Sequence, residues 1–191
     1  MKELGLLFSW TAYFYLHSLL AAIPVKRSIS QLLSIRSPRI YRIGYNLFFL
    51  AGLILLVYWQ LVFPSTLLFS TRVTTNILAF CLMIPGLVIM MASIKNYDWK
   101  SYAGITNEKS HSLVIKGMNK YARHPLYSGT MLFLLGFLLW EPSYKNLWVW
   151  LLMWVYLAIG MRYEEKKLVN TYGTEYENYQ KKVKKMIPFI W

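Results

Sequence analysis

Long apolar runs separated by short basic segments dominate the pattern of this chain. Residues 4–23, 43–63 and 74–94 contain no Lys, Arg, Asp or Glu. A helix needs about 20 mostly apolar residues to cross the hydrocarbon core of a bilayer. Each of the three runs therefore predicts a membrane-spanning helix.

A cleavable signal peptide is an alternative interpretation of residues 4–23. Such a peptide has a basic start, a shorter apolar core and a cleavage site made of small residues. This chain instead begins with Lys2-Glu3, and its longer apolar run contains His17. We therefore expect the first run to be retained as a span.

Two shorter apolar runs follow in the second half of the chain, at residues 126–140 and 147–161. A helix of that length rises about 22 Å, less than the hydrocarbon core of about 30 Å. We interpret the two runs as a helical hairpin with its turn at Glu141–Asn146. Its helices are expected to continue beyond the apolar runs at the other membrane face.

These elements predict an all-α fold, a polytopic membrane protein with five transmembrane helices and a cytosolic C-terminal helical segment. Residues 1–94 form a first part with three spans. Residues 95–191 form a second part with the hairpin and the tail. Polar residues gather in segments 95–125 and 162–191, so any chemistry is expected there, at the mouth of the last two spans.

The charge distribution predicts the orientation of the spans. The 191 residues include 21 Lys and Arg but only 8 Asp and Glu, for a net charge of +13. All the basic residues except Lys2, Arg72 and Lys145 lie in segments that one membrane face would share. Basic loops favour the cytosolic side, so we expect an outside N-terminus and a cytosolic C-terminus. Topology and anionic lipid then explain the basic surplus better than nucleic acid does.

Cysteine usage excludes two further classes of protein. Cys81 is the single cysteine, so the chain has neither an internal disulfide framework nor a cysteine-cluster metal site. No metal is expected.

The tail predicts a break between two helices. Gly173 is a typical C-terminal stop, and Thr174 with Glu177 predicts a capping box for a new helix. In that helix Tyr176 and Tyr179 recur at helical spacing among several lysines. The pattern is typical of an amphipathic helix lying on anionic lipid.

Three charges just after the last apolar run allow two interpretations. Arg162 and Glu165 are spaced i,i+3 and share a helix face, whereas Glu164 points about 100° away. They form either a surface ion pair, which contributes little, or a functional group at the base of the hairpin, where unpaired charge is costly.

A second polar motif, Arg123-His124-Pro125-x-Tyr127, stands at the entrance of the fourth span. Pro125 suits the first turn of a helix, where its missing N–H has no consequence. Two basic side chains beside open backbone N–H groups at a helix start form a corner that suits an anion.

These motifs resemble the signature of integral-membrane methyltransferases related to isoprenylcysteine carboxyl methyltransferase. The likeness covers residues 111–191 and rests on two ordered motifs separated by the hairpin. The first is Leu113-Val114…Gly117…Tyr121…Arg123-His124-Pro125-x-Tyr127-x-Gly129, and the second is Glu164-Glu165-x-x-Leu168, Tyr172-Gly173-x-x-Tyr176-x-x-Tyr179. Met118-Asn119 departs from the family pattern.

The first half is similar to the methanethiol S-methyltransferase branch of the same enzymes. The shorter matches are His17-Ser18, Tyr58-Trp59-Gln60 and Asn96-Tyr97-Asp98. This likeness makes His17 a candidate base for a thiol acceptor. The alternative is a polar residue that pairs with another helix.

The resemblance implies S-adenosylmethionine as cofactor, held on the cytosolic side by the hairpin, the preceding loop and the tail. Leu113 and Val114 would pack the adenine, Arg123 and His124 would suit the carboxylate, and Glu164 and Glu165 would accept hydrogen bonds from the ammonium or the ribose. The implied cofactor-binding set is His111, Leu113, Val114, Gly117, Tyr121, His124, Pro125, Tyr127, Glu164 and Glu165. Arg123 and Arg162 are the implied catalytic residues, with Arg162 orienting an anionic acceptor.

The acceptor stays open among a prenylated cysteine carboxylate, a small thiol and a lipid amine. Two other functions compete with methyl transfer, an NADPH-dependent sterol-type reductase and a non-enzymatic membrane protein. The reductases carry a similar His-Pro-x-Tyr-x-Gly motif but are usually longer. Small size and missing targeting features favour a prokaryotic cytoplasmic membrane.

Overall fold

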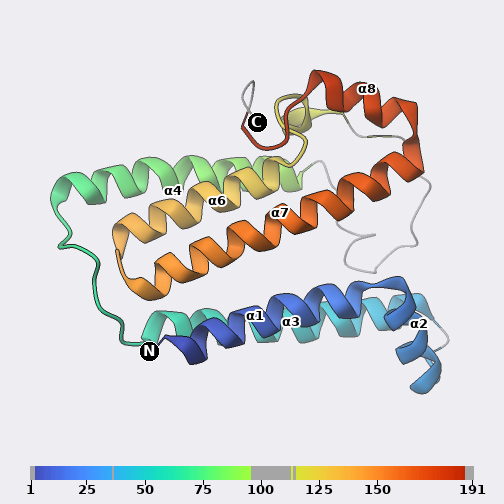
Figure 1. Cartoon of the computed structure of the whole chain (residues 1–191), viewed down its shortest axis with the longest axis horizontal. Helices are drawn as coiled ribbons and strands as arrows, with labels where there is room; N and C mark the ends of the chain where they lie inside the picture. The colour runs from blue at the N-terminus through green and yellow to red at the C-terminus, as the bar shows by residue number, and fades with distance from the viewer. Residues whose placement is uncertain (1–2, 36, 96–112, 114, 188–191) are drawn as a thin grey trace. The chain divides into compact units, whose positions relative to one another are not determined.

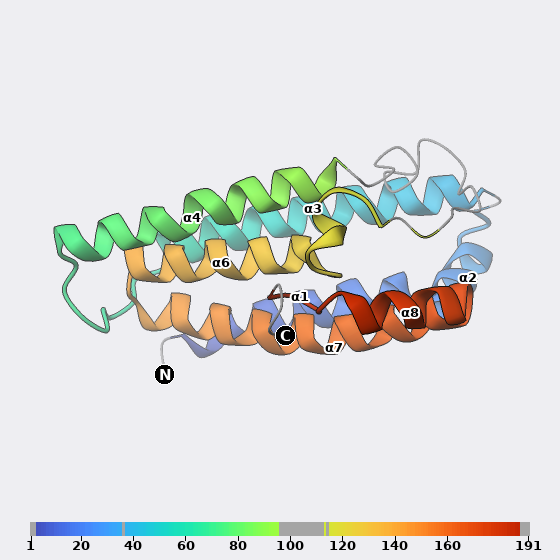
Figure 2. The same ribbon diagram turned by 90° about the horizontal axis from the view of Figure 1, so that it is seen from above.

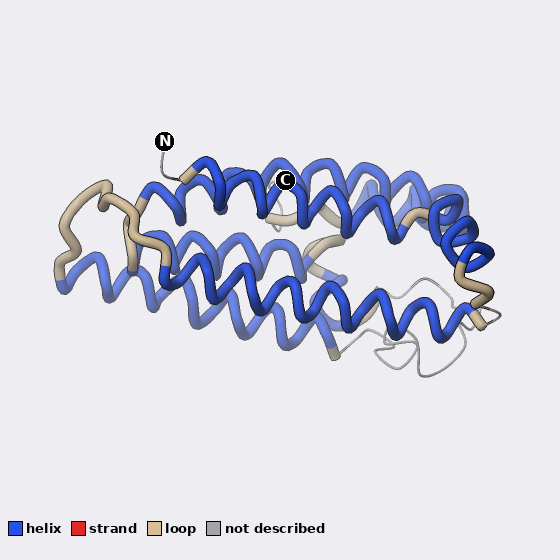
Figure 3. The backbone as a smooth tube through the Cα atoms, turned by 90° about the horizontal axis from the view of Figure 1, so that it is seen from below, coloured by secondary structure: helices blue, strands red, loops and turns tan. Residues whose placement is uncertain are grey.

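The computed structural model describes residues 3–35, 37–95, 113 and 115–187. Across these ranges the chain is helical and contains no strand; Figure 3 shows helices joined by short loops. The elements, labelled in Figure 1, are α1 (Leu4–Ala21), α2 (Ile23–Leu32), α3 (Pro38–Val62), α4 (Val73–Ile94), the 3-10 helix η1 (Gly117–Lys120), α6 (Pro125–Trp140), α7 (Tyr144–Tyr172) and α8 (Thr174–Lys182).

Three of these helices, α1, α3 and α4, are long and apolar enough to cross a membrane. They coincide with the three apolar runs, which confirms those predictions, and they make the chain a multi-pass membrane protein. The helix α3 begins earlier than its apolar run, because Pro38 occupies its first turn, a position that suits proline.

The described residues fall into two compact units, one before and one after the boundary between Thr66 and Leu67. In the first unit α1 packs against α3 through aromatic side chains. The indole N–H of Trp10 donates to Gln60 Oε1 at 3.2 Å, and the Tyr13 hydroxyl donates to the Phe49 carbonyl at 3.0 Å. Such hydrogen bonds pair polar groups that would otherwise be unsatisfied in lipid.

His17 lies in the same aromatic layer. Its ring meets Phe49 edge-on at 4.9 Å between centroids and lies 5.4 Å from the ring of Tyr45. The Tyr45 hydroxyl donates to the His17 carbonyl at 2.8 Å. This surrounding fits a histidine that joins two helices, and its role as a base stays a prediction.

The helix α2 was not expected, since a ten-residue helix is too short to produce a long apolar run. Ala22, whose backbone is extended, separates it from α1. Pro24 stands in its first turn and Ser34, in the left-handed region at φ 54°, follows its end. Residues 24–42 are therefore partly a structured helix and not merely a basic loop.

In the second unit, α4 and α6 run antiparallel and side by side (Figure 2). Glycines on α6 allow this close approach because they have no Cβ atom. A Cβ at Gly136 would lie 2.6 Å from the Ala79 carbonyl oxygen, and one at Gly129 would lie 2.7 Å from the Gly86 carbonyl oxygen. Small residues are what allow membrane helices to bring their backbones together.

The turn between α6 and α7 is shorter than predicted. Residues 141–146 were expected to form it, but α7 already begins at Tyr144. The reason is local bonding at the start of α7. The Asn146 side chain donates to the Glu141 carbonyl at 2.8 Å, and Lys145 Nζ lies 2.9 Å from Glu141 Oε1.

The helix α7 continues well past its apolar run, as predicted, and ends at Tyr172 before Gly173. Gly173 takes a positive φ of 56°, which favours glycine. The capping box at Thr174 and Glu177 is wrong, because Gly173 itself occupies the N-cap position of α8 and no side chain caps that helix. Thr174 is already the first helical residue.

Candidate functional site

The site begins where α6 begins. Pro125 occupies the first turn of α6 and His124 is its N-cap residue. The tail runs alongside, since the backbone N–H of Arg123 donates to the Lys184 carbonyl and that of His124 to the Lys185 carbonyl, both at 2.9 Å. The helix entrance and the C-terminal segment are thereby joined.

Arg123 connects this entrance to α7 and to the tail. Its Nε and Nη2 donate to Glu165 Oε1 at 2.8 and 2.5 Å. Its Nη1 donates to the backbone carbonyls of Gln180, at 3.2 Å, and of Val183. All three guanidinium nitrogens are engaged, and the side chain is only 7% exposed. Arg123 therefore acts here as a link between three segments.

Glu165 is the centre of the charged contacts. Besides Arg123, it has His124 Nε2 at 3.3 Å and Lys185 Nζ at 3.5 Å. Burial disfavours its charged form, but the hydrogen bond and charge of Arg123, the charge of Lys185 and the hydrogen bond of His124 outweigh burial and lower its pKa. The carboxylate stays ionised at neutral pH.

Glu164 lies beside it and is more open. The Tyr127 hydroxyl donates to Glu164 Oε2 at 3.0 Å, and His124 Nδ1 lies 3.5 Å from the same oxygen. Burial raises the pKa of Glu164, yet His124, Tyr127 and Lys167 together lower it further than burial raises it. Its side chain is 38% exposed, so this carboxylate is open to a ligand.

The His124 ring fits between the two carboxylates. Its two nitrogens face Glu164 and Glu165, and the ring stacks on Tyr127 with an interplanar angle of 3° and 5.4 Å between centroids. We call Arg123, His124, Tyr127, Glu164, Glu165 and Lys185 the hairpin-base cluster.

Tyr176 of α8 supplies a further polar atom nearby. The residue is 1% exposed, and its hydroxyl has no hydrogen-bond partner among the described residues. Burial and then the charge of Glu165 raise its pKa. Buried hydroxyls normally have a partner, so the Tyr176 hydroxyl retains a hydrogen-bonding capacity that the described residues do not use.

The remaining predicted site residues lie in several places. Gly117 starts η1 with a positive φ of 57°, Tyr121 is 56% exposed, and Leu113 is half-buried. Arg162 is exposed on α7 and Pro125 is buried. His111 and Val114 lie outside the described residues.

The structure brings Arg123, His124, Tyr127, Glu164 and Glu165 together as one group. Arg162 stays apart, because Glu165 pairs with Arg123 and Lys185 and not with the residue one turn before it. Sequence reasoning missed Lys185 as a member of the group. Its spacing of 20 residues from Glu165 carries no local signal.

A pocket of about 320 Å³ lies between Ile115 and α8. Its lining combines aliphatic and polar side chains from residues Ile115, Glu175, Asn178, Tyr179, Lys182 and Val183. Val183 also contributes its carbonyl to Arg123. The pocket therefore borders the hairpin-base cluster through the tail. Within the described ranges no group of three or more His, Cys, Asp or Glu suits a metal ion.

Residues 5–191 match the family model described as NnrU protein. The chain is similar to protein-S-isoprenylcysteine O-methyltransferase of Schizosaccharomyces pombe, 35% identical over 83 residues, which are 43% of this chain and 35% of that protein. The Saccharomyces cerevisiae protein of the same name is 27% identical over 138 residues, 67% of this chain and 56% of that protein.

Methanethiol S-methyltransferase of Crocosphaera subtropica is 29% identical over 147 residues, 72% of this chain and 57% of that protein. The matches thus cover 35% to 57% of these three relatives. No solved structure matches the chain at a significant level.

Proposed function

This chain belongs to the NnrU protein family, and from that premise we propose that it is an integral-membrane methyltransferase dependent on S-adenosylmethionine. The observation that carries the proposal is the hairpin-base cluster. It gathers two ionised carboxylates, a histidine, a tyrosine and an accessible lysine at one end of an apolar hairpin. The names of the similar proteins, O- and S-methyltransferases, support the reaction class.

The polar groups of the cluster fit the amino-acid end and the ribose of this cofactor. Glu164 Oε2 is engaged by Tyr127 and His124, whereas its Oε1 has no hydrogen-bond partner among the described residues. That oxygen is an acceptor for an ammonium or a ribose hydroxyl. Lys185 Nζ, on a side chain 34% exposed, is a donor for a carboxylate.

Two further groups complete the proposed cofactor site. The buried Tyr176 hydroxyl is a hydrogen-bonding group without a described partner. The pocket beside Ile115, which follows Leu113 and Val114 in the chain, would take the apolar face of the adenine. His111, Gly117, Tyr121 and Pro125 stay in the proposed set on the family resemblance alone.

Arg123 has a different role in this proposal from Arg162. Since its nitrogens are engaged by Glu165 and by tail carbonyls, we assign Arg123 as a positioning residue that holds α7 and the tail. Arg162, exposed on α7, has its donors available to orient an anionic acceptor.

S-adenosylmethionine would supply a methyl group from its sulfonium. The acceptor nucleophile would form a bond to the methyl carbon as the sulfur–methyl bond breaks, and S-adenosylhomocysteine would be the leaving group. The residues of the chain align the acceptor and exclude water from it. We propose a prenylcysteine carboxylate or a thiol as acceptor. A thiol, with a pKa of about 8.5, needs help with deprotonation. The family resemblance alone makes His17 a candidate for that base.

The membrane arrangement that we propose has five spans. The helices α6 and α7 add a hairpin to α1, α3 and α4. The N-terminus is outside, and the hairpin-base cluster and tail are cytosolic in a prokaryotic cytoplasmic membrane. In the functional division, residues 1–94 contribute three spans and residues 95–191 contribute the cofactor-binding chemistry.

Calorimetric titration of S-adenosylhomocysteine into the detergent-purified full-length protein tests the proposal. We expect micromolar binding that Glu164→Gln weakens about tenfold, because a charge-assisted hydrogen bond becomes a weaker neutral one. Glu177→Gln, an exposed change on α8, is the matched control and should bind like wild type.

Folded protein that does not bind S-adenosylhomocysteine would overturn the proposal, and binding of NADPH in its place would favour a reductase. If binding is found, transfer of labelled methyl to a farnesylated cysteine analogue or to methanethiol then identifies the acceptor class.

A further inference from the structure

The helix α2 lies at the membrane surface by its position in the chain. It joins α1 to α3, and both of those helices are long and apolar enough to span a bilayer. Large apolar side chains at its two ends are exposed, with Ile23 at 69%, Leu32 at 83% and Leu33 at 62%. A short helix with exposed apolar side chains and basic residues suits the boundary between headgroups and acyl chains.

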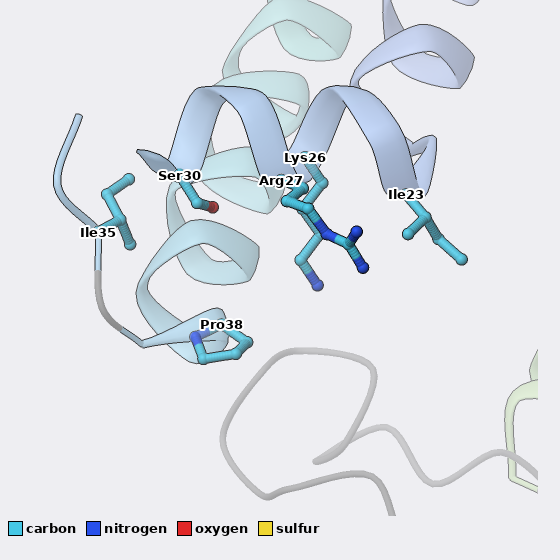
Figure 4. A pocket seen from close by; sticks show the side chains of 6 residues that line it. All are labelled: Ile23, Lys26, Arg27, Ser30, Ile35 and Pro38. Carbon is cyan, nitrogen blue, oxygen red and sulfur yellow. The ribbon is translucent and has the colours of Figure 1, made fainter. Parts of the chain in front are cut away.

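One side of α2 forms a pocket of about 280 Å³, which we call the α2 pocket. Lys26, Arg27 and Ser30 come from α2, Ile35 from the segment that follows it, and Pro38 from the start of α3 (Figure 4). Ile23 completes the rim. Two cations and a hydroxyl thus share one hollow with aliphatic side chains.

Contacts within the unit hold the basic side chain of Lys26. Its Nζ lies 5.9 Å from the centroid of the Tyr41 ring, a cation–π distance. The Tyr41 hydroxyl donates in turn to the Leu20 carbonyl at 2.7 Å. This contact places the ammonium group beside the Tyr41 ring.

The charge of the α2 pocket is not neutralised by the described part of its own unit. Neither Lys26 nor Arg27 forms an ion pair among the described residues. The acid that the structure describes in this unit is Glu3, which stands just before α1. Its carboxylate accepts a hydrogen bond from the Ser65 hydroxyl. An 18-residue helix separates it from α2, a rise of about 27 Å.

We propose that the α2 pocket binds the phosphate of an anionic phospholipid. A phosphate accepts charge-assisted hydrogen bonds from Arg and Lys, and the Ser30 hydroxyl adds a neutral donor. Ile23, Ile35 and Pro38 offer apolar contact to the glycerol and the first acyl carbons. A membrane surface supplies this ligand next to the helix, and free inorganic phosphate would leave the aliphatic rim unused.

The test uses full-length protein in a mild detergent, titrated separately with short-chain phosphatidylglycerol, short-chain phosphatidylcholine and inorganic phosphate. We expect phosphatidylglycerol to bind best. The double variant Lys26→Gln, Arg27→Gln should weaken its binding by about tenfold or more, since each basic residue contributes to attraction of anionic lipid.

Two further variants separate a built site from general charge. Lys26→Arg with Arg27→Lys keeps both charges and should keep most of the binding. Lys120→Gln with Lys166→Gln removes two exposed charges that lie outside α2 and α8 and should leave binding unchanged.

Three results would each overturn the proposal. These are equal binding of the two lipids, equal loss of binding in the Lys26/Arg27 and Lys120/Lys166 double variants, and inorganic phosphate binding as tightly as phosphatidylglycerol. Size-exclusion profiles and thermal unfolding of each variant show that it is folded. The outcome does not depend on methyl transfer, so it is independent of the proposed function.

Discussion

At the scale of single residues, neighbouring acids have different surroundings. Glu165 is held by Arg123, Lys185 and His124, so its carboxylate is largely occupied. Glu164, next in the chain, points to Tyr127 and His124 and stays partly open. Replacing Glu165 should therefore affect mainly stability, and replacing Glu164 should affect mainly ligand binding.

Glu165→Gln should destabilise the protein by about 2–3 kcal/mol at neutral pH, because hydrogen bonds between charged groups are lost. The pKa of Glu165 lies below its ordinary value of 4.5. Its ion pairs therefore contribute fully above that value, and their contribution is lost as pH falls through the lowered pKa. Thermal unfolding from about pH 7 to about pH 3 should show the gap to wild type closing on the acid side.

Glu177→Gln serves as the control for this variant, since Glu177 is exposed on α8. It should leave the unfolding curve almost unchanged at every pH. A Glu165→Gln gap that stays constant down to the most acidic pH would show that ionisation of this carboxyl is not what stabilises the fold.

Tyr127→Phe removes the hydroxyl that donates to Glu164 at 3.0 Å while keeping the ring that stacks on His124. The pKa of Glu164 should rise toward its ordinary value. Binding of S-adenosylhomocysteine should weaken about threefold to tenfold and decline at a higher pH than in wild type. Calorimetry across the acid range measures both effects, with the exposed Tyr163→Phe as control. Identical acid limits for Tyr127→Phe and wild type would refute this role.

At the scale of elements, glycine positions decide how α4 meets α6. Gly129 and Gly136 are seven residues apart on α6, and they face Gly86 and Ala79, seven apart on α4. Because the helices are antiparallel, the two spacings coincide and the backbones come close. This packing holds α6 against α4 and so helps to fix the position of His124, the N-cap residue of α6.

Gly136→Ala should destabilise the second unit by about 1–3 kcal/mol, the usual cost of overpacking. Its Cβ would lie 2.6 Å from the Ala79 carbonyl oxygen and 2.9 Å from the Met83 backbone nitrogen, neither of which can swing aside. Gly160→Ala, on α7, meets nothing within 4 Å and should stabilise its helix by about 0.5–1 kcal/mol. Opposite shifts of the unfolding midpoint in detergent are expected, and equal shifts would contradict the close packing.

At the scale of the whole molecule, the basic segments and the apolar helices agree on one topology. The helices α1, α3 and α4 provide three crossings, and the proposed α6–α7 hairpin returns the chain to the same side. In the proposed five-span topology, the loop that contains α2 and the segment that precedes α6 would both be basic cytosolic loops, as the positive-inside rule requires.

Reporter fusions test that topology directly. Alkaline phosphatase fused after Ser70, between α3 and α4, should be active outside the cytoplasm. The same reporter fused after Ser34, following α2, should be inactive, and green fluorescent protein fused after Trp191 should fluoresce. Activity at Ser34 would invert the proposed orientation.

The sequence by itself determined the helical class, the three long spans, the continuation of α7 and its end just before Gly173. These features depend on local composition and on the conformational preference of glycine. It also identified Arg123-His124 and Glu164-Glu165 as the polar motifs, because charges beside apolar runs are costly unless they have partners.

The tertiary structure alone decided which partners those charges have. Arg123 and Glu165 are 42 residues apart, so nothing in local spacing reveals that they pair in preference to Arg162 and Glu165. The same holds for Lys185, for the Tyr176 hydroxyl, which has no partner among the described residues, and for the glycine contacts between α4 and α6. Such contacts form between distant segments, and only the packing of the helices brings those segments together.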